Sequence, residues 1–299
     1  ASPLYVLLEN DYPYSFTFLV DSMKKIAALT MARNESYFLA KWLEYYGAQL
    51  GEDNLYVFLD GEDQLLPANT KAHVQQCPKI EAKRTAFDKV RMAFLSEQAA
   101  LLFQQGYEVV IGCDADEFLV IDPNCNTSLA AYLSQVALPG SLSGLGIDVG
   151  QHLTQETAID WTQPFLQQRS YALLSTRYTK PVVLGKPLRW GSGFHRVKGN
   201  NFHIDSNLYV FHFGGFDKAY LEAKYTDKER MQAGWEAHIG RRLKTSQLVT
   251  QKTPVAADKV MNRVRKMQTW FRRPFAWNKP SMMGFKCVVT LPERFKHIL

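Results

Sequence analysis

Three acidic side chains separate two apolar runs in the middle of the chain and could bind a metal ion. The first run, 109–111, leads into Cys-Asp114-Ala-Asp116-Glu117, and a second run, 118–121, follows at once. Carboxylates at the end of a buried strand repel one another unless a cation or several hydrogen-bond donors lie between them. In an extended Asp-x-Asp segment both side chains point to one face, so both can bind one divalent ion. The alternative interpretation is a solvated acidic turn.

Two earlier apolar segments also end in polar loops. Residues 26–31 lead into an Ala-Arg-Asn-Glu loop, 32–35, and residues 55–59 lead into an acidic turn that starts at Asp60. Short runs rich in β-branched or aromatic residues are typical of buried strands. Helical patterns separate these runs, so the sequence predicts an α/β fold with a mostly parallel sheet and helices on both faces. Ligands bind beyond the carboxyl ends of such strands, so we expect the three polar loops to converge at one edge.

The positions of the other elements follow from the spacing of apolar residues. Strands are expected over residues 26–31, 55–59, 80–82, 109–111, 145–149 and 208–213. Helices are expected over residues 35–50, 67–76, 87–105, 128–136, 218–234 and 259–273. We expect residues 1–25 to form an N-terminal extension, residues 26–235 the main domain, and residues 236–299 a mainly helical, basic segment packed on it.

The composition, with 46% hydrophobic and 21% charged residues, is typical of a globular protein of one large domain or two smaller ones. The 299 residues carry a net charge of +6, which suits an anionic ligand or surface but falls short of a nucleic-acid-binding signature. Four widely spaced cysteines indicate reduced thiols and a cytoplasmic location. The sequence has no apolar run of membrane-spanning length and no evident signal peptide; it does not begin with Met, so a lost targeting segment stays open.

Four motifs, in their order and spacing, are similar to those of a known enzyme family. They are Thr-Met-Ala-Arg-Asn-Glu at residues 30–35, Trp-Leu-Glu-Tyr-Tyr at 42–46, Leu-Asp-Gly at 59–61 and Asp-Ala-Asp-Glu-Phe at 114–118. Together they resemble the family 2-like glycosyltransferases of GT-A fold, in the branch with an Arg-Asn-Glu loop and an Asp-Ala-Asp-Glu-Phe metal motif. The resemblance covers roughly residues 26–225. The turn after Asp60 departs from the pattern, because the family commonly has a longer Asn/Asp-Ser-x-Asp-Gly turn there.

The resemblance implies a GT-A-like α/β domain and a metal-dependent, hexosyltransferase-type enzyme of inverting stereochemistry. Mn²⁺ or Mg²⁺ would be held by Asp114 and Asp116, the second being the expected direct ligand, and would neutralise the departing diphosphate. His212 would add a metal or diphosphate contact; the alternative is a core histidine between two phenylalanines. Glu117 would order the loop or point away from it.

The resemblance also assigns the nucleotide to the first two strand ends. Arg33, Asn34 and Glu35 would contact the base or ribose, with helix capping as the alternative interpretation. Asp60 would accept a hydrogen bond from the same part of the donor, unless it only forms an Asp-Gly turn. Lys186 would contact the diphosphate as one of a basic set, for which a solvated face is the alternative. That set comprises Lys180, Lys186, Arg189, Arg196 and Lys198.

An inverting transfer also needs a carboxylate that deprotonates the acceptor hydroxyl. Asp148, near the end of the expected strand 145–149, is the leading candidate for this catalytic base. Glu156, Asp160 and Asp217 are the alternatives. A retaining enzyme would need no such base, so the sequence leaves the stereochemistry open.

The expected function is transfer of a sugar from a nucleoside-diphosphate donor to a glycan or lipid-linked acceptor in bacterial surface-polysaccharide synthesis. Among such donors a UDP-sugar is the one that we expect. The basic segment 259–273 has apolar residues at helical spacing, so it could lie on the inner face of a membrane or pack on the domain. No nucleic-acid partner is expected. The alternatives are a nucleotidyltransferase or phosphoesterase that uses the same carboxylates, and a non-catalytic module that binds nucleotide sugars.

Overall fold

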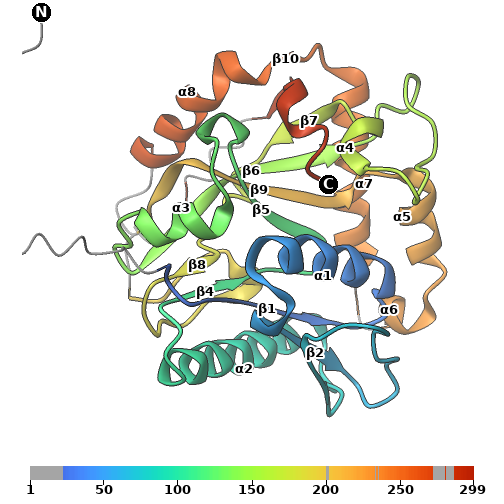
Figure 1. Cartoon of the computed structure of the whole chain (residues 1–299). Helices are drawn as coiled ribbons and strands as arrows, with labels where there is room; N and C mark the ends of the chain where they lie inside the picture. Colours follow the sequence, from blue (N-terminus) through green and yellow to red (C-terminus); the bar gives the residue numbers. More distant parts are fainter. Residues whose placement is uncertain (1–22, 200–201, 233, 235, 272–279, 281–285) are drawn as a thin grey trace, which may run out of the picture.

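The computed structural model describes residues 23–199, 202–232, 234, 236–271, 280 and 286–299. Most of the expected N-terminal extension therefore lies outside the described residues. The described chain forms a twisted sheet with helices packed around it (Figure 1). None of its described helices is both long and apolar enough to cross a bilayer.

The centre of the sheet is parallel, as the alternation of strands and helices predicts. β1 (Ile26–Ala32) lies between β2 (Leu55–Asp60) and β4 (Val109–Gly112) and is parallel to both. β3 (His73–Cys77) pairs parallel with the other side of β2. The carboxyl ends of β1, β2 and β4 therefore point in one direction, which places the loops that follow them at one edge.

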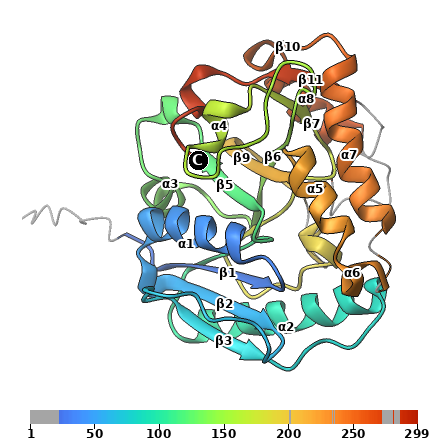
Figure 2. The same ribbon diagram turned by 90° about the vertical axis from the view of Figure 1, so that its right-hand side faces the viewer.

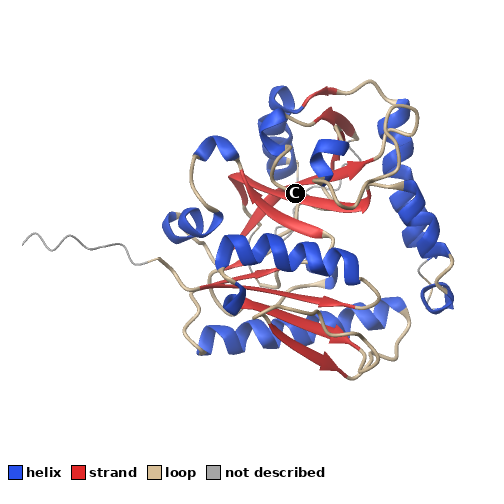
Figure 3. Cartoon of the chain, turned by 45° about the vertical axis from the view of Figure 1, so that its right-hand side comes forward, coloured by secondary structure: helices blue, strands red, loops and turns tan. Residues whose placement is uncertain are grey.

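Two long helices cover opposite faces of these strands, because successive side chains of a strand point to opposite sides. α1 (Ser36–Leu50) and α2 (Arg84–Gln104) lie on either side of the sheet in Figures 2 and 3. Ala28 of β1 belongs to the apolar core beneath α1, and Leu29 belongs to the separate core beneath α2. The expected helices on both faces are confirmed.

Beyond β4 the sheet becomes mixed. β8 (Val183–Leu184) is antiparallel to both β4 and β6 (Ser141–Gly150). β6 pairs antiparallel with β7 (Tyr171–Leu174), which in turn pairs antiparallel with β11 (Cys287–Thr290). β10 (Val255–Ala256) is parallel to β11. The fold is therefore α/β, with a large mixed sheet built on a parallel core.

A branch of this sheet brings three polar residues side by side. β9 (Ile204–Gly215) pairs antiparallel with β5 (Glu117–Ile121) and parallel with β6. In this register His212 of β9 stands opposite Glu117 of β5 and also opposite Asp148 of β6. Three strands from distant parts of the sequence thus place these side chains next to one another.

The expected helix over residues 67–76 and the expected strand over residues 80–82 are wrong. β3 lies at the edge of the sheet instead, where most of its side chains are exposed. It therefore lacks the apolar alternation that marks a half-buried strand. The backbone N–H of Ile80 donates to the Asp60 carboxylate at 2.7 Å rather than to a neighbouring strand.

The expected helix over residues 218–234 is interrupted. It consists of α5 (Lys218–Tyr225) and α6 (Lys228–Gln232). The hydroxyl of Thr226 donates to the carbonyl of Ala223 at 2.6 Å, and such local bonds compete with the helical ladder.

The remaining short helices join strands of the sheet. α3 (Leu129–Gln135) matches its expected position and is capped by Ser128, whose hydroxyl accepts from the Ala131 N–H. α4 (Phe165–Gln168) precedes β7. Single 3-10 turns occur at Glu52–Asn54, Pro123–Cys125, Ser192–Phe194 and Glu293–Phe295.

The C-terminal segment is more closely joined to the sheet than the sequence indicates. Its helices are α7 (Glu236–Gln251) and α8 (Ala257–Trp270). Between and after them the chain supplies β10 and β11, which extend the sheet beyond β7. The segment is therefore not only a helical layer packed on the domain, since it also completes the sheet.

Candidate metal centre

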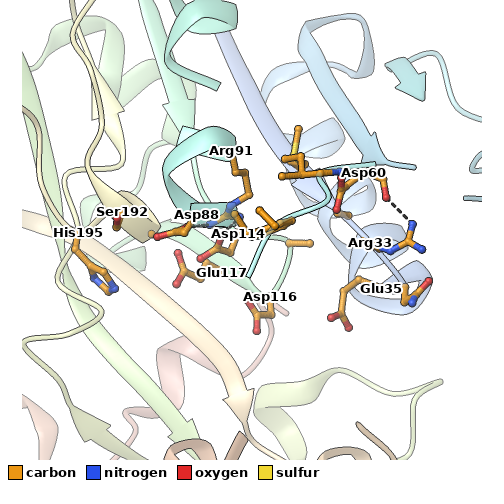
Figure 4. Close-up of a pocket in the computed structure, with 18 of the residues that line it drawn as sticks. Arg33, Glu35, Asp60, Asp88, Arg91, Asp114, Asp116, Glu117, Ser192 and His195 are labelled. Atoms are coloured by element: carbon orange, nitrogen blue, oxygen red, sulfur yellow. Dashed lines mark hydrogen bonds and ion pairs between the residues drawn. The ribbon is translucent and has the colours of Figure 1, made fainter. Parts of the chain in front are cut away.

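The three polar strand ends meet in one cavity of about 740 Å³. Residues 33–35 after β1, Asp60 at the end of β2 and residues 114–117 after β4 all contribute to its lining. In Figure 4 the acidic loop 114–117 lies in the middle of the view, with Arg33 and Asp60 on one side of it and His195 on the other. The expected convergence of these loops at one edge is confirmed.

Asp116, Glu117 and His212 form a compact group in this cavity. One ligand atom from each lies within 4.8 Å of the others. All three side chains are buried, with exposed fractions of 6%, 1% and 1% for the residues in that order. The register of β5 with β9 sets Glu117 beside His212, and the backbone N–H of Phe213 donates to the carbonyl of Asp116 at 3.0 Å.

The hydrogen bonds of His212 decide which of its nitrogens can bind a cation. Nδ1 lies 2.6 Å from Oδ1 of Asp148, whose other oxygen accepts from the Thr245 hydroxyl at 2.6 Å. A carboxylate only accepts, so we assign the proton to Nδ1, which leaves a lone pair on Nε2. The ring of Tyr178 stacks on the imidazole with centroids 3.5 Å apart. Burial lowers the pKa of His212 to about 4, although Asp148 opposes the shift, so the ring is neutral near pH 7.

Two acceptor atoms consequently face each other in a buried place. Nε2 of His212 lies 3.7 Å from Oδ2 of Asp116. Glu117 adds a third acceptor: its Oε1 pairs with Lys180 at 2.5 Å, whereas its buried Oε2 has no hydrogen-bond partner. Burial raises the pKa of Glu117 to about 8 against the effect of Lys180. A buried acceptor without a donor, such as Oε2 of Glu117, is costly, and a divalent cation would satisfy it together with Nε2 of His212 and the Asp116 carboxylate.

Asp114 lies outside this group, in contrast to its expected role as a metal ligand. Its Oδ1 pairs with Arg91 at 2.6 Å and its Oδ2 with Lys180 at 3.1 Å. Burial opposes ionisation, but Lys180 and Arg91 hold the pKa of Asp114 well below its usual range. Both oxygens thus pair with cations of the chain, and the group that could hold a metal ion contains Glu117 beside Asp116 and His212.

Arg242 of α7 is a site residue that the sequence interpretation missed. Its Nη2 lies 2.9 Å from Oδ2 of Asp116, the same oxygen that faces His212. Gly214 makes this approach possible: a Cβ there would lie 2.4 Å from the His212 ring and 2.7 Å from Nε of Arg242. The two successive glycines after Phe213 were the available signal, because glycine often marks a close approach of other groups to the backbone.

The expected nucleotide residues at the first strand end all line the cavity. The guanidinium of Arg33 donates to the Asp60 carbonyl at 2.6 Å and to the Asp63 carboxylate at 2.8 and 2.9 Å. Arg33 therefore ties the first two loops together. Asn34 has a positive φ of 49°, and α1 has no side-chain cap, so helix capping does not account for this residue.

Glu35 and Asp60 occupy buried or half-buried positions of the same wall. Glu35 pairs with Lys224 at 2.7 Å and accepts from the hydroxyl of Tyr220. Asp60 is 2% exposed and accepts from the backbone N–H of Ile80. Its carboxylate thus does more than form an Asp-Gly turn, because it fixes the segment that follows β3.

Two expected roles do not fit the observed positions. Lys186 is exposed and is not part of the cavity lining, whereas Lys180 of the same basic set is buried in it. Asp148 does not line the cavity either, and both its oxygens accept from neighbouring side chains. The alternative bases, Glu156, Asp160 and Asp217, also lie outside the lining.

No protein-family model matches the sequence, and a search of curated proteins finds no match.

Proposed function

We propose that the protein is a metal-dependent glycosyltransferase that uses a nucleoside-diphosphate sugar as its donor. The observation that carries the proposal is the buried group of Asp116, Glu117 and His212 beside a cavity into which three strand-end loops converge. The motif resemblance to family 2-like glycosyltransferases supports the same function and a GT-A-like fold. A cavity of about 740 Å³ is within the usual size range of small-molecule sites.

Mn²⁺ is the cation that we propose for this site. One imidazole nitrogen and two carboxylates form a mixed ligand set. Mg²⁺ prefers oxygen ligands and near-ideal octahedral geometry, whereas Mn²⁺ accepts imidazole more readily. When bound, the ion would act as a Lewis acid that stabilises the negative charge of the departing diphosphate.

Residues of the chain would supply the other contacts of the donor. Arg242 is a cation at the metal group itself, with only 14% of its side chain exposed, and would hold diphosphate oxygens beside the ion. Asn34 and Asp60 lie on the cavity wall and would bind the nucleoside. Lys180 would keep Asp114 ionised and hold the Glu117 carboxyl group in place.

Asp148 would serve as a positioning residue rather than as the base. It holds Nδ1 of His212, which directs Nε2 towards Asp116. An inverting transfer would therefore need another carboxylate of the cavity wall. Glu35, Glu81 and Asp88 line the cavity outside the metal group and are candidates for substitution analysis.

The direct test is an assay of intact sugar transfer. Purified protein is incubated with nucleoside-diphosphate sugars, Mn²⁺ and a panel of glycan acceptors, and mass spectrometry detects the glycosylated product. Asp116→Asn should abolish Mn²⁺-dependent transfer, because it removes a buried ligand charge. Asp53→Asn, a change of the same chemistry at an exposed position outside the cavity lining, should leave transfer unchanged.

Two results would contradict the proposal. One is full transfer by Asp116→Asn or by wild-type protein in excess chelator. The other is pyrophosphate release from nucleoside triphosphates without sugar transfer, which would indicate a nucleotidyltransferase.

A further inference from the structure

The helix α8 has two very different sides. Its inner side contributes Met261 and Val264 to the same apolar core as Phe211 of β9. Packing on the domain, one of the two roles expected for residues 259–273, therefore holds for this inner face; residues 272 and 273 lie outside the described residues. The outer face is a separate surface that this packing leaves uncovered.

A stripe of three cations and one tryptophan runs along the outer face. Lys259, Arg263, Lys266 and Trp270 follow one another at spacings of four, three and four residues, which places them on one side of a helix, and all four are exposed. The single acidic residue of α8, Asp258, is paired with Arg294 at 2.7 Å. No carboxylate of α8 is therefore left to neutralise the stripe.

The stripe ends in an exposed aromatic pair. Trp270 is 72% exposed and Phe271 is 54% exposed. Among the large hydrophobic residues that are exposed in the described part of the chain, these are the only aromatic ones. Two neighbouring aromatic rings in water are unfavourable unless a partner covers them.

We propose that the outer face of α8 binds an anionic membrane surface. Cations at helical spacing attract acidic lipid headgroups, and the rings of Trp270 and Phe271 suit the boundary between headgroups and acyl chains. A nucleic acid would explain the cations, but the exposed aromatic pair at the end of the stripe favours lipid. A second copy of the chain is disfavoured because two cationic stripes would repel each other.

This surface does not depend on the proposed transferase function. α8 lies on the opposite side of the molecule from α2, at the upper edge of Figure 1. None of its residues lines the cavity. Its role can therefore be tested by binding alone, and either proposal can fail without the other.

The test is co-sedimentation of the full chain with vesicles of phosphatidylglycerol and phosphatidylcholine, compared with vesicles of phosphatidylcholine alone. We expect binding to the anionic vesicles, with a partition coefficient that falls as salt increases. The triple variant Lys259→Gln, Arg263→Gln, Lys266→Gln should lower that coefficient at least about tenfold. The double variant Trp270→Ala, Phe271→Ala should also lower the partition coefficient, but its binding should still weaken as salt increases.

A matched control separates the stripe from net charge. The triple variant Lys71→Gln, Lys89→Gln, Lys218→Gln removes the same charge from exposed positions outside α8 and outside the cavity lining, and it should bind as the wild type does. Unchanged melting temperatures would show that all variants fold.

Four outcomes would overturn the proposal: no binding to anionic vesicles, equal binding to both vesicle types, equal loss in the control variant, or a concentration-dependent dimer that Trp270→Ala abolishes. The chain could instead bind a single-stranded oligonucleotide more tightly than anionic vesicles and lose that binding in the triple variant of Lys259, Arg263 and Lys266. This result would assign the stripe to nucleic acid.

Discussion

His212 connects the candidate metal group to the core of the protein. Asp148 holds its Nδ1, Tyr178 stacks on its ring, and Nε2 faces Asp116. Hydrogen bonds of this kind fix the tautomer and orientation of metal-binding histidines elsewhere. The same arrangement explains why Asp148, which the sequence presents as a base, is buried and away from the cavity.

Asp148→Asn should weaken Mn²⁺ binding by about 10- to 100-fold, because the substituted amide holds the imidazole less firmly. Isothermal titration calorimetry of the nucleotide-free protein measures the change. Asp122→Asn is the matched control: it removes another partly buried carboxylate, which pairs with Arg294 remote from the metal group, and should leave Mn²⁺ affinity unchanged. Equal affinities of Asp148→Asn and wild type would contradict a positioning role for Asp148.

Arg242 and a metal ion would compete for Oδ2 of Asp116. Arg242→Met removes a cation from the group, so Mn²⁺ should bind more tightly in the absence of nucleotide. The same variant should bind a nucleoside diphosphate more weakly when Mn²⁺ is saturating, because it lacks a contact to the diphosphate.

Electron paramagnetic resonance of free Mn²⁺ and calorimetry with UDP measure these two opposite effects. Arg177→Met, which removes an exposed cation from the same cavity lining, should change Mn²⁺ affinity far less. Weaker Mn²⁺ binding by Arg242→Met would contradict the competition.

At the scale of elements, the three-strand register of β5, β9 and β6 builds the site. It sets Glu117, His212 and Asp148 in one row, and α7 closes over this row with Arg242 and Thr245. The backbone of β9 must leave room for α7 at the end of the row, which is why Gly214 follows there.

Gly214→Ala should lower the free energy of unfolding by about 1–3 kcal/mol, because its Cβ would overlap with His212 and Arg242. It should also weaken Mn²⁺ binding. Gly240→Ala is the control: a Cβ there would meet only the Tyr225 hydroxyl, at 3.4 Å, and alanine favours a helix. Urea denaturation of both variants checks the expectation, and equal stability of Gly214→Ala and wild type would contradict the packing described here.

The sequence predicts elements well where burial leaves a pattern, and less well elsewhere. β1, β2, β4 and α1 are confirmed because each buries a run or a stripe of apolar residues. β3 has mostly polar, exposed side chains, and its pairing with β2 rather than its composition makes it a strand.

At the scale of the whole molecule, the C-terminal segment is part of the site. The expected boundary between residues 26–235 and 236–299 separates Asp116 from Arg242, which are in contact. β11 of the same segment belongs to the main sheet. The convergence of the strand-end loops was predictable, since it follows from the direction of parallel strands. The contribution of α7 was not predictable, because it depends on a contact between Asp116 and Arg242, which are far apart in the sequence.

The most direct measurement of the central claim is a thermal-shift screen of UDP, GDP, CDP and TDP with and without Mn²⁺. A ligand that binds only the folded state raises the melting temperature by an amount that grows with its affinity and its concentration, so all nucleotides are compared at one concentration. We expect Mn²⁺ to raise it, one nucleoside diphosphate to raise it further only when Mn²⁺ is present, and Asp116→Asn to lose both shifts. Equal nucleotide shifts in Mn²⁺ and in chelator, or shifts retained by Asp116→Asn, would contradict a metal-dependent nucleotide site.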